Sequence, residues 1–282
     1  MYTLKNDRLT VLINQTGAEI RSIKFDSEDV LWSGDPEFWA GVSPIMFPVC
    51  GGLRDDIFEF EGKQYPMVKH GYARFEKFEI ESSTNSSVTF LHKSSEETHK
   101  HFPWDYELRI TYSLHGAALD VRYDVKNTSD STMLFSIGSH EGYACPEGIE
   151  DYDIIFPQKE TLDAWPISGY FLEHKPVRLL KESNVFPLYY KYFAVDALVF
   201  KDLKSRSATL RNRRTGRSVT VNFPDCNYFL LWTRPDAGYI CMEPWCGIQS
   251  MVDDGYDISV KEGIKRLAAG STFTATHTIN CN

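Results

Sequence analysis

Apolar and polar residues alternate without interruption in Tyr106-Glu107-Leu108-Arg109-Ile110-Thr111-Tyr112-Ser113-Leu114. The short segment His115-Gly116-Ala117 follows, and the alternation then resumes over residues 119–125. Successive side chains of a β-strand point to opposite faces, so a period of two is typical of a strand with one buried face. The segment therefore predicts a β-hairpin with one side in the core.

Strand signals of the same kind recur along the chain. Two further hairpins are expected, one pairing 8–14 with 18–25 and one pairing 57–60 with 64–65. Other strands are predicted over residues 77–82, 88–93, 132–137, 153–156, 197–200, 218–222, 228–233, 239–243 and 272–280.

Helical patterns are few and short, and the best of them cover residues 95–101 and 257–265. Many short strands at regular spacing, with so little helix, indicate an all-β protein built as a large antiparallel β-sandwich. No linker, repeat or low-complexity tract divides the chain, so we expect one domain over residues 1–282.

The composition narrows the class of partner. The formal net charge is −9, which argues against a nucleic-acid-binding surface, because such surfaces are basic. Aromatic residues reach 14%, a content that suits both pleated sheets and the walls of sugar-binding sites. A small molecule is therefore the expected partner, and the sequence carries no signal for the oligomeric state.

The N-terminal residues and the cysteines indicate the cellular compartment and whether a metal site is expected. The first residues lack the apolar run of a signal peptide, and no stretch approaches the ~18 apolar residues of a membrane-spanning helix. The six cysteines are scattered, as expected for free thiols in a reducing cytoplasm. Cys241 and Cys246 have no second Cys or His pair at matching spacing, so we predict neither a metal site nor a cofactor.

Three segments carry the side chains best suited to proton transfer. In Ile240–Ile248, Glu243 follows an apolar run, and Pro244, which cannot donate to a ladder, is expected to end that strand. The segments Lys69–Arg74 and Ile137–Tyr143 each set a histidine among glycines, where backbone can approach a ligand closely. Two histidines and a glutamate can move protons on and off a neutral molecule near pH 7.

Neighbouring residues give these segments a binding character. Trp245 offers a flat apolar face that suits a sugar ring, and Asp196 is an acid inside an apolar run, where it is either paired or part of a site. Glu141 is expected to be solvated, and His277 is expected at the surface or a sheet edge.

Taken in order, these segments resemble the aldose 1-epimerase (galactose mutarotase-like) family, in its compact bacterial branch, over nearly the whole chain. The motifs that carry the resemblance are Leu31–Pro36 with Trp39, Pro44–Pro48, His70–Arg74, Gly138–Tyr143, Asp196–Leu198 and Glu243–Ile248.

The resemblance implies a sandwich with the sugar in a cleft on one sheet, and it implies roles for individual residues. Glu243 matches the general base, His140 the general acid, and His70 a histidine that orients the sugar. Asp196 matches an acid that binds sugar hydroxyls, and Arg54 is the nearest match to a sugar-binding arginine. The further sugar contacts expected within the motifs are Arg74, Tyr143 and Trp245.

Two departures from the family pattern stand out. Relatives often have Gly-Arg where this chain has Gly51-Gly52, which puts the match of Arg54 two residues out of step. Relatives also often have proline where this chain has Glu141, a change that bears on specificity more than on chemistry.

The expected activity is interconversion of the α and β anomers of an aldose by acid–base ring opening and reclosure. Two other functions fit the same residues. A β-sandwich glycoside hydrolase would need two carboxylates flanking the bond, which Glu243 and Asp196 could supply. A carbohydrate-binding protein without turnover would need the cleft but not the proton-transfer groups.

Overall fold

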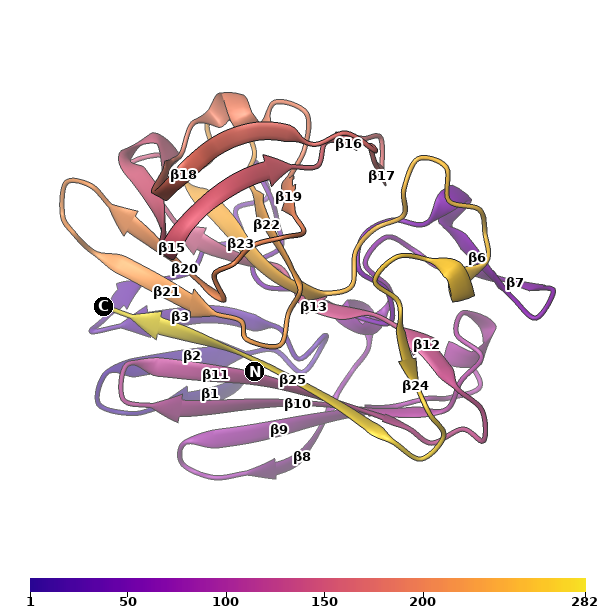
Figure 1. Cartoon of the computed structure of the whole chain (residues 1–282). Helices are drawn as coiled ribbons and strands as arrows, with labels where there is room; N and C mark the ends of the chain where they lie inside the picture. Colours follow the sequence, from indigo (N-terminus) through magenta and orange to yellow (C-terminus); the bar gives the residue numbers. More distant parts are fainter.

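The computed structural model describes residues 1–282, and its regular secondary structure is almost wholly β-strand (Figure 1). This confirms the all-β prediction. Helix is limited to single 3₁₀ turns at Arg54–Asp56, Ala73–Phe75, Thr98–Lys100, Ile149–Asp151, Tyr190–Phe193 and Ile258–Val260.

The two predicted helices are wrong in extent. Each predicted helix is reduced to a single 3₁₀ turn, at Thr98–Lys100 and at Ile258–Val260. After the second turn the chain passes through Gly263, in the left-handed region at φ 75°, into the strand Lys265–Leu267. Isolated helices this short are marginal because nucleation fixes several residues for one hydrogen bond.

A nine-stranded antiparallel sheet forms one layer of the molecule. In spatial order its strands are β18 (Val177–Pro187), β15 (Tyr152–Ala164), β20 (Ser207–Asn212), β21 (Ser218–Asn222), β25 (Thr272–Cys281), β11 (Ala118–Asn127), β10 (Tyr106–His115), β9 (Ser87–Lys93) and β8 (Glu79–Ser83). The predicted hairpin is confirmed, since Tyr106 pairs with Asn127 and His115 with Ala118.

A second sheet lies against the first and carries the candidate site. Its strand order is β19 (Leu198–Phe200), β22 (Tyr228–Trp232), β23 (Tyr239–Cys246), β13 (Ile137–Ser139) and β5 (Ile45–Met46), and β14 (Glu141–Ala144) also pairs with β23. All eight residues of β23 are buried, which matches its unbroken apolar character. The expectation that Pro244 ends this strand is wrong, because pairing resumes beyond it and continues to Cys246.

Smaller sheets complete the fold. A four-stranded sheet holds β1 (Tyr2–Lys5), β2 (Leu9–Ile13), β3 (Ile20–Phe25) and β4 (Glu28–Asp29). Two-stranded pairs join β6 (Ile57–Phe60) with β7 (Lys63–Pro66), β12 (Met133–Phe135) with β24 (Lys265–Leu267), and β16 (Ile167–Ser168) with β17 (Phe171–Leu172). The β2–β3 and β6–β7 pairs confirm the other two predicted hairpins.

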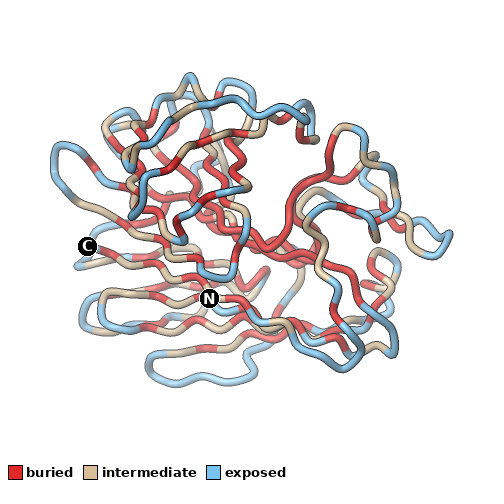
Figure 2. Tube along the Cα trace, in the orientation of Figure 1, coloured by how far each residue is buried: buried red, intermediate tan, exposed pale blue.

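The main hydrophobic core runs through the molecule. Its 67 buried residues extend from Leu4 to Cys281 and include side chains of both large sheets. Figure 2 shows this core as buried backbone in the strands, with the exposed segments at the turns. No helix has both the length and the apolar character needed to cross a membrane.

Candidate active site

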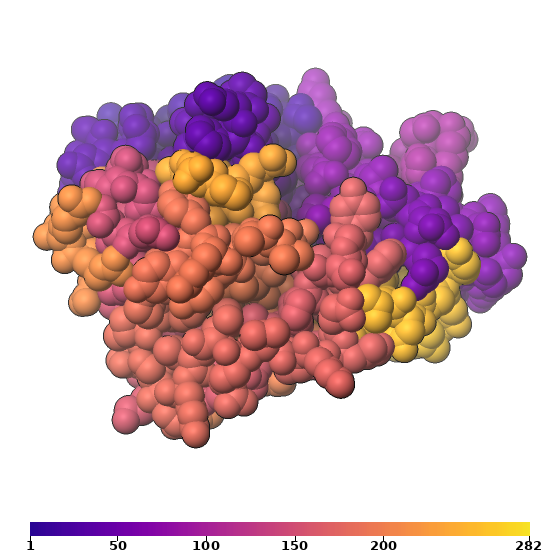
Figure 3. Space-filling view, turned by 90° about the horizontal axis from the view of Figure 1, so that it is seen from above, coloured from indigo at the N-terminus to yellow at the C-terminus, as the bar shows by residue number.

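A cavity of about 530 Å³ lies over the β22–β23 part of the second sheet. Its walls come from segments between Trp39 and Gln249, so the fold assembles it from distant parts of the chain. Figure 3 shows segments from the beginning, middle and end of the sequence side by side on one face of the molecule. The volume falls in the range of about 300–1,000 Å³ that is usual for small-molecule sites.

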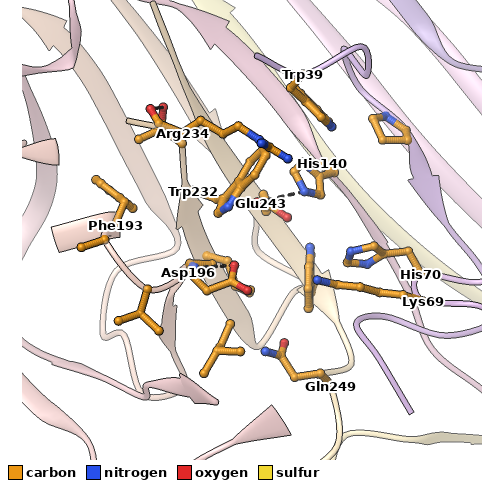
Figure 4. Close-up of a pocket in the computed structure, with 18 of the residues that line it drawn as sticks. Trp39, Lys69, His70, His140, Phe193, Asp196, Trp232, Arg234, Glu243 and Gln249 are labelled. Atoms are coloured by element: carbon orange, nitrogen blue, oxygen red, sulfur yellow. Dashed lines mark hydrogen bonds and ion pairs between the residues drawn. The ribbon is translucent and has the colours of Figure 1, made fainter. Parts of the chain in front are cut away.

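Six of the eight residues expected at the site line this cavity. They are His70, Arg74, His140, Asp196, Glu243 and Trp245. Figure 4 shows His140 and Glu243 together at the centre, with His70 and Asp196 on either side.

The register of the sheet brings His140 and Glu243 together. Gly138 of β13 lies opposite Trp245, and Glu141 of β14 lies opposite Met242. Continued between these points, the same register places His140 directly opposite Glu243 on the same face. Nε2 of His140 lies 3.5 Å from Oε1 of Glu243.

Backbone pairing lapses where these two side chains meet. The lapse coincides with Pro244, which has no N–H to donate. The carbonyl of Ser139 accepts instead from the indole Nε1–H of Trp245, at 3.1 Å. His140 therefore lies at a break between two strand segments, β13 and β14, that both pair with β23.

Burial sets the charge of this pair. Desolvation raises the pKa of Glu243 well above its ordinary value, and the negative charge of Glu141 acts in the same direction. Desolvation also lowers the pKa of His140 to about 3, assisted by the positive charges of Lys69 and Arg74. At pH values between these two pKa values the pair holds a single proton, which resides on Glu243 in the free protein.

His70 is held in a defined orientation beside the pair. Its backbone N–H donates to the carbonyl of Gly51, and the N–H of Gly51 donates to its Nδ1 at 3.1 Å. Burial lowers the pKa of His70 well below its ordinary value, so the ring is neutral. With Nδ1 accepting, the ring proton resides on Nε2, which can donate to a bound hydroxyl.

The backbone conformation and close packing of Gly71 explain why a glycine follows His70. It lies in the left-handed region at φ 71°, and a Cβ there would come within 2.2 Å of the carbonyl oxygen of Phe47. Close backbone packing thus fixes the start of the segment that presents His70.

Aromatic rings enclose the pair. The ring of His140 lies 4.9 Å from that of Trp39 and 5.4 Å from that of Trp232, centroid to centroid. Asp196, after the turn Tyr190–Phe193, faces them across the cavity, and its Oδ1 accepts from the N–H of Ala197 at 2.7 Å. Apolar faces with a few fixed polar groups are the usual makeup of a sugar site.

Arg54 lies outside the cavity, contrary to expectation. Its Nε donates to the carbonyl of Asp254 at 2.7 Å and its Nη2 to that of Val252 at 2.6 Å, while the guanidinium covers the ring of Phe171. These contacts join the segment of Arg54 to the loop at residues 252–254, so the side chain stabilises the fold and is not free to bind a sugar.

Tyr143 also lies outside the cavity. It is fully buried in the hydrophobic core, because β14 alternates its side chains and Tyr143 shares the face of Glu141 opposite to that of His140.

Glu141 and His277 form a buried pair beneath the site. Nε2 of His277 lies 3.0 Å from Oε1 of Glu141, and Oε2 of Glu141 accepts from the hydroxyl of Ser139 at 2.7 Å. The pair joins β14 of one large sheet to β25 of the other. The expectations of a solvated Glu141 and a peripheral His277 are therefore wrong, since both are buried.

Several cavity residues escaped the sequence analysis, namely Lys69, Trp232, Arg234 and Gln249. A signal existed for Trp232, because it lies in the predicted strand that precedes the strand of Glu243 in a hairpin. Arg234 lies in the turn after that strand and had no signal. Gln249 had no such signal. It is buried, and its Oε1 has no hydrogen-bond partner in the protein.

The groups nearest to a metal-ligating set are His140, Cys241 and Glu243, whose donor atoms lie within 4.8 Å of one another. A metal would require the thiolate and the carboxylate. Burial raises the pKa of both Cys241 and Glu243 well above their ordinary values, so both favour their protonated, non-ligating forms.

Comparison with known proteins agrees with this architecture. The family model described as aldose 1-epimerase matches residues 1–278. The plasmid-encoded protein LacX of Lactococcus lactis subsp. lactis is 32% identical over 291 residues, covering 98% of this chain and 97% of LacX.

Two solved structures share the fold closely. A galactose mutarotase related enzyme from Lactobacillus acidophilus is 32% identical, with a TM-score of 0.94 and coverage of 100% of this chain and 97% of that one. A galactose mutarotase-like protein from Lactobacillus casei is 28% identical, with a TM-score of 0.95 and full coverage of both chains. With a family model and relatives that span it almost end to end, the chain belongs to the aldose 1-epimerase family.

Proposed function

We propose that this protein is an aldose 1-epimerase that interconverts the α and β anomers of an aldose. The observation that carries the proposal is the contact between His140 and Glu243, two proton-transfer groups 3.5 Å apart in a cavity of sugar-binding size. A protein that only binds sugar has no need of a buried carboxyl group and imidazole that share one proton.

The shared proton suits the reaction. Its transfer from Glu243 to His140 produces a carboxylate and an imidazolium in one step, which are the base and acid that ring opening requires. Glu243 then removes the proton from the C1 hydroxyl while His140 delivers one to the ring oxygen, and the C1–O5 bond breaks. Rotation about C1–C2 presents the other face of the aldehyde, and reclosure returns both protons.

Neighbouring groups hold the sugar during this exchange. The Nε2–H of His70 donates to a sugar oxygen, Asp196 accepts from hydroxyls, and Trp39 and Trp232 cover the apolar faces of the ring. Neither electrons nor a phosphoryl group are transferred, so the reaction requires no nicotinamide and no magnesium.

The test is a screen of anomerically pure aldoses followed by polarimetry and by NMR exchange between the two C1 signals. We expect rates well above spontaneous mutarotation for at least one sugar, with the excess abolished in Glu243→Gln. Release of reducing sugar from glycosides would instead indicate a hydrolase. Tight binding with no rate excess for any sugar would indicate a binding protein.

A further inference from the structure

Three cationic side chains line the cavity without carboxylate partners. They are Lys69, Arg74 and Arg234, and none forms an ion pair, whereas Arg8, Arg109 and most other arginines of the chain do.

The cavity therefore carries an excess of positive charge inside an acidic protein. Its carboxyl groups are Asp196 and Glu243, against three cations, while the whole chain has a net charge of −9. The raised pKa of Glu243 favours its neutral form and enlarges the excess. Lys69 and Arg74 are partly buried, and cations in that position without counterions are costly, so an anion entering the cavity removes an existing penalty. Arg234 is exposed and adds its charge at the opposite wall.

The cations approach from opposite walls. Nη2 of Arg74 donates to the carbonyl of Lys69 at 2.8 Å, which holds both on the segment that presents His70. Arg234 comes from the turn between β22 and β23. Figure 4 shows Lys69 and Arg234 extending toward each other, with His140 and Glu243 between their walls.

The amide of Gln249 adds a neutral contact beside Lys69. Its side chain is buried, with 4% of the residue exposed, and its Oε1 lacks a protein partner. An unpartnered buried polar group at a cavity wall indicates a position that a ligand hydroxyl would satisfy.

We propose that the substrate of this site is an aldose that carries an anionic group, either a phosphate ester or a carboxylate, on a carbon distant from C1. This inference rests on the proposed epimerase function and specifies its substrate class. The anionic group lies at the Arg234 wall, within the positive field of Lys69 and Arg74 on the opposite wall, and C1 lies at the His140–Glu243 pair. Guanidinium and ammonium groups bind phosphate and carboxylate through charge-assisted hydrogen bonds, which are about twice as strong as neutral ones.

The first arm of the test compares substrates on the parent protein. The probes are glucose and galactose, their 6-phosphates, and glucuronic and galacturonic acids, each followed by NMR exchange between C1 signals. We expect kcat/KM for at least one anionic sugar to exceed that of its neutral counterpart by about tenfold or more, with the advantage shrinking as salt rises. Comparison of kcat/KM for the 6-phosphates with kcat/KM for the uronic acids distinguishes a phosphate from a carboxylate substrate.

The second arm uses Arg234→Gln, with Arg211→Gln as the control. Both arginines are exposed and neither forms an ion pair, but Arg211 lies on β20, outside the cavity. We expect Arg234→Gln to lower the anionic-to-neutral ratio of kcat/KM by about tenfold, mainly through KM, because one charge-assisted contact is lost. Arg211→Gln should leave the ratio unchanged.

The two proposals fail in different ways. If neutral aldoses are interconverted as efficiently as the anionic ones, or if Arg234→Gln leaves the ratio unchanged, the anionic substrate is wrong and the epimerase stands. If no aldose of either kind is interconverted faster than in buffer, the epimerase itself is wrong. Tight calorimetric binding of an anionic sugar without interconversion would retain the charge recognition and overturn the activity.

Discussion

His140 and Glu243 face each other across antiparallel strands at the point where the backbone ladder between those strands lapses. Their meeting follows from sheet register, since paired strands bring opposite side chains on one face to within about 5 Å at Cβ. The lapse beside Pro244 leaves the pair flanked by a side-chain hydrogen bond from Trp245 in place of backbone pairing. The arrangement places an acid–base pair on a scaffold whose geometry is fixed before a sugar arrives.

Replacing Glu243 with Gln should reduce turnover by at least about 10², the usual range for a lost general base or acid. The amide preserves size and hydrogen bonding but cannot exchange the shared proton, so sugar binding should change little. Polarimetry measures turnover, and calorimetry measures binding. Near-normal turnover in this variant would remove Glu243 from the mechanism.

The pH dependence of turnover should follow the proton shared by the pair. The pKa of His140 is lowered to about 3 and that of Glu243 is raised, so the singly protonated state spans the range between them. Above that range the pair loses its proton and no acid remains, so turnover should fall on the alkaline side. Because the groups are coupled, the limbs belong to the pair. A rate that rises steadily with pH through the alkaline range would contradict the shared proton.

Glu141→Gln should move the alkaline limb of that profile to lower pH. The negative charge of Glu141 raises the pKa of Glu243, so its removal lowers the pH at which the pair loses its proton. The amide can still bond to His277 and Ser139, so the fold is retained. Glu96→Gln, at an exposed position without an ion pair, is the control. An unshifted limb in a folded Glu141→Gln protein would show that this charge does not reach the pair.

Asp196→Asn should weaken sugar binding while largely sparing the chemical step. The substitution removes the charge that strengthens hydrogen bonds to hydroxyls, which predicts an increase in KM of about tenfold with a smaller change in kcat. Steady-state kinetics on a sugar that the parent protein interconverts would measure this split. A large loss confined to kcat would instead make Asp196 part of the proton transfer, as in the hydrolase alternative.

Gly71→Ala should destabilise the protein far more than Gly116→Ala. Both glycines are in the left-handed region, at φ 71° and 60°, so each alanine costs about 1–2 kcal/mol of backbone strain. Only at Gly71 would the new Cβ also clash with backbone, 2.2 Å from the Phe47 carbonyl oxygen, whereas Gly116 has open space. Urea unfolding of the two variants gives the comparison, and equal losses would mean that the Phe47 contact relaxes freely.

The fold was largely accessible from the sequence because strand periodicity is local. The alternation in Tyr106–Leu114 identifies which side chains are buried, and the strand with which it pairs is the next one in the sequence. The two helices failed because a few residues of helical pattern do not outweigh the cost of nucleation. The prediction that Pro244 ends its strand failed for a different reason. A proline is tolerated within a strand where the backbone hydrogen-bond ladder to the neighbouring strand is interrupted.

The site was only partly accessible. The family motif places Tyr143 among the sugar contacts, whereas strand alternation puts its side chain on the face opposite His140. Arg54 carries no sequence mark of its bonds to the carbonyls of Val252 and Asp254, some 200 residues away. Arg234 lies in an exposed turn, and only the three-dimensional structure shows that this turn borders the cavity.

The strand β23 is paired on both sides and buried throughout, while Asp196 and Arg234 lie in turns outside the sheet. Substitutions in those turns can change which sugar fits without displacing the pair that moves protons. Sugar preference and chemistry are thus free to diverge separately in descendants of this chain. Mutations in the exposed turns can change the preferred sugar, while the proton-transfer chemistry is retained as long as the sheet is retained.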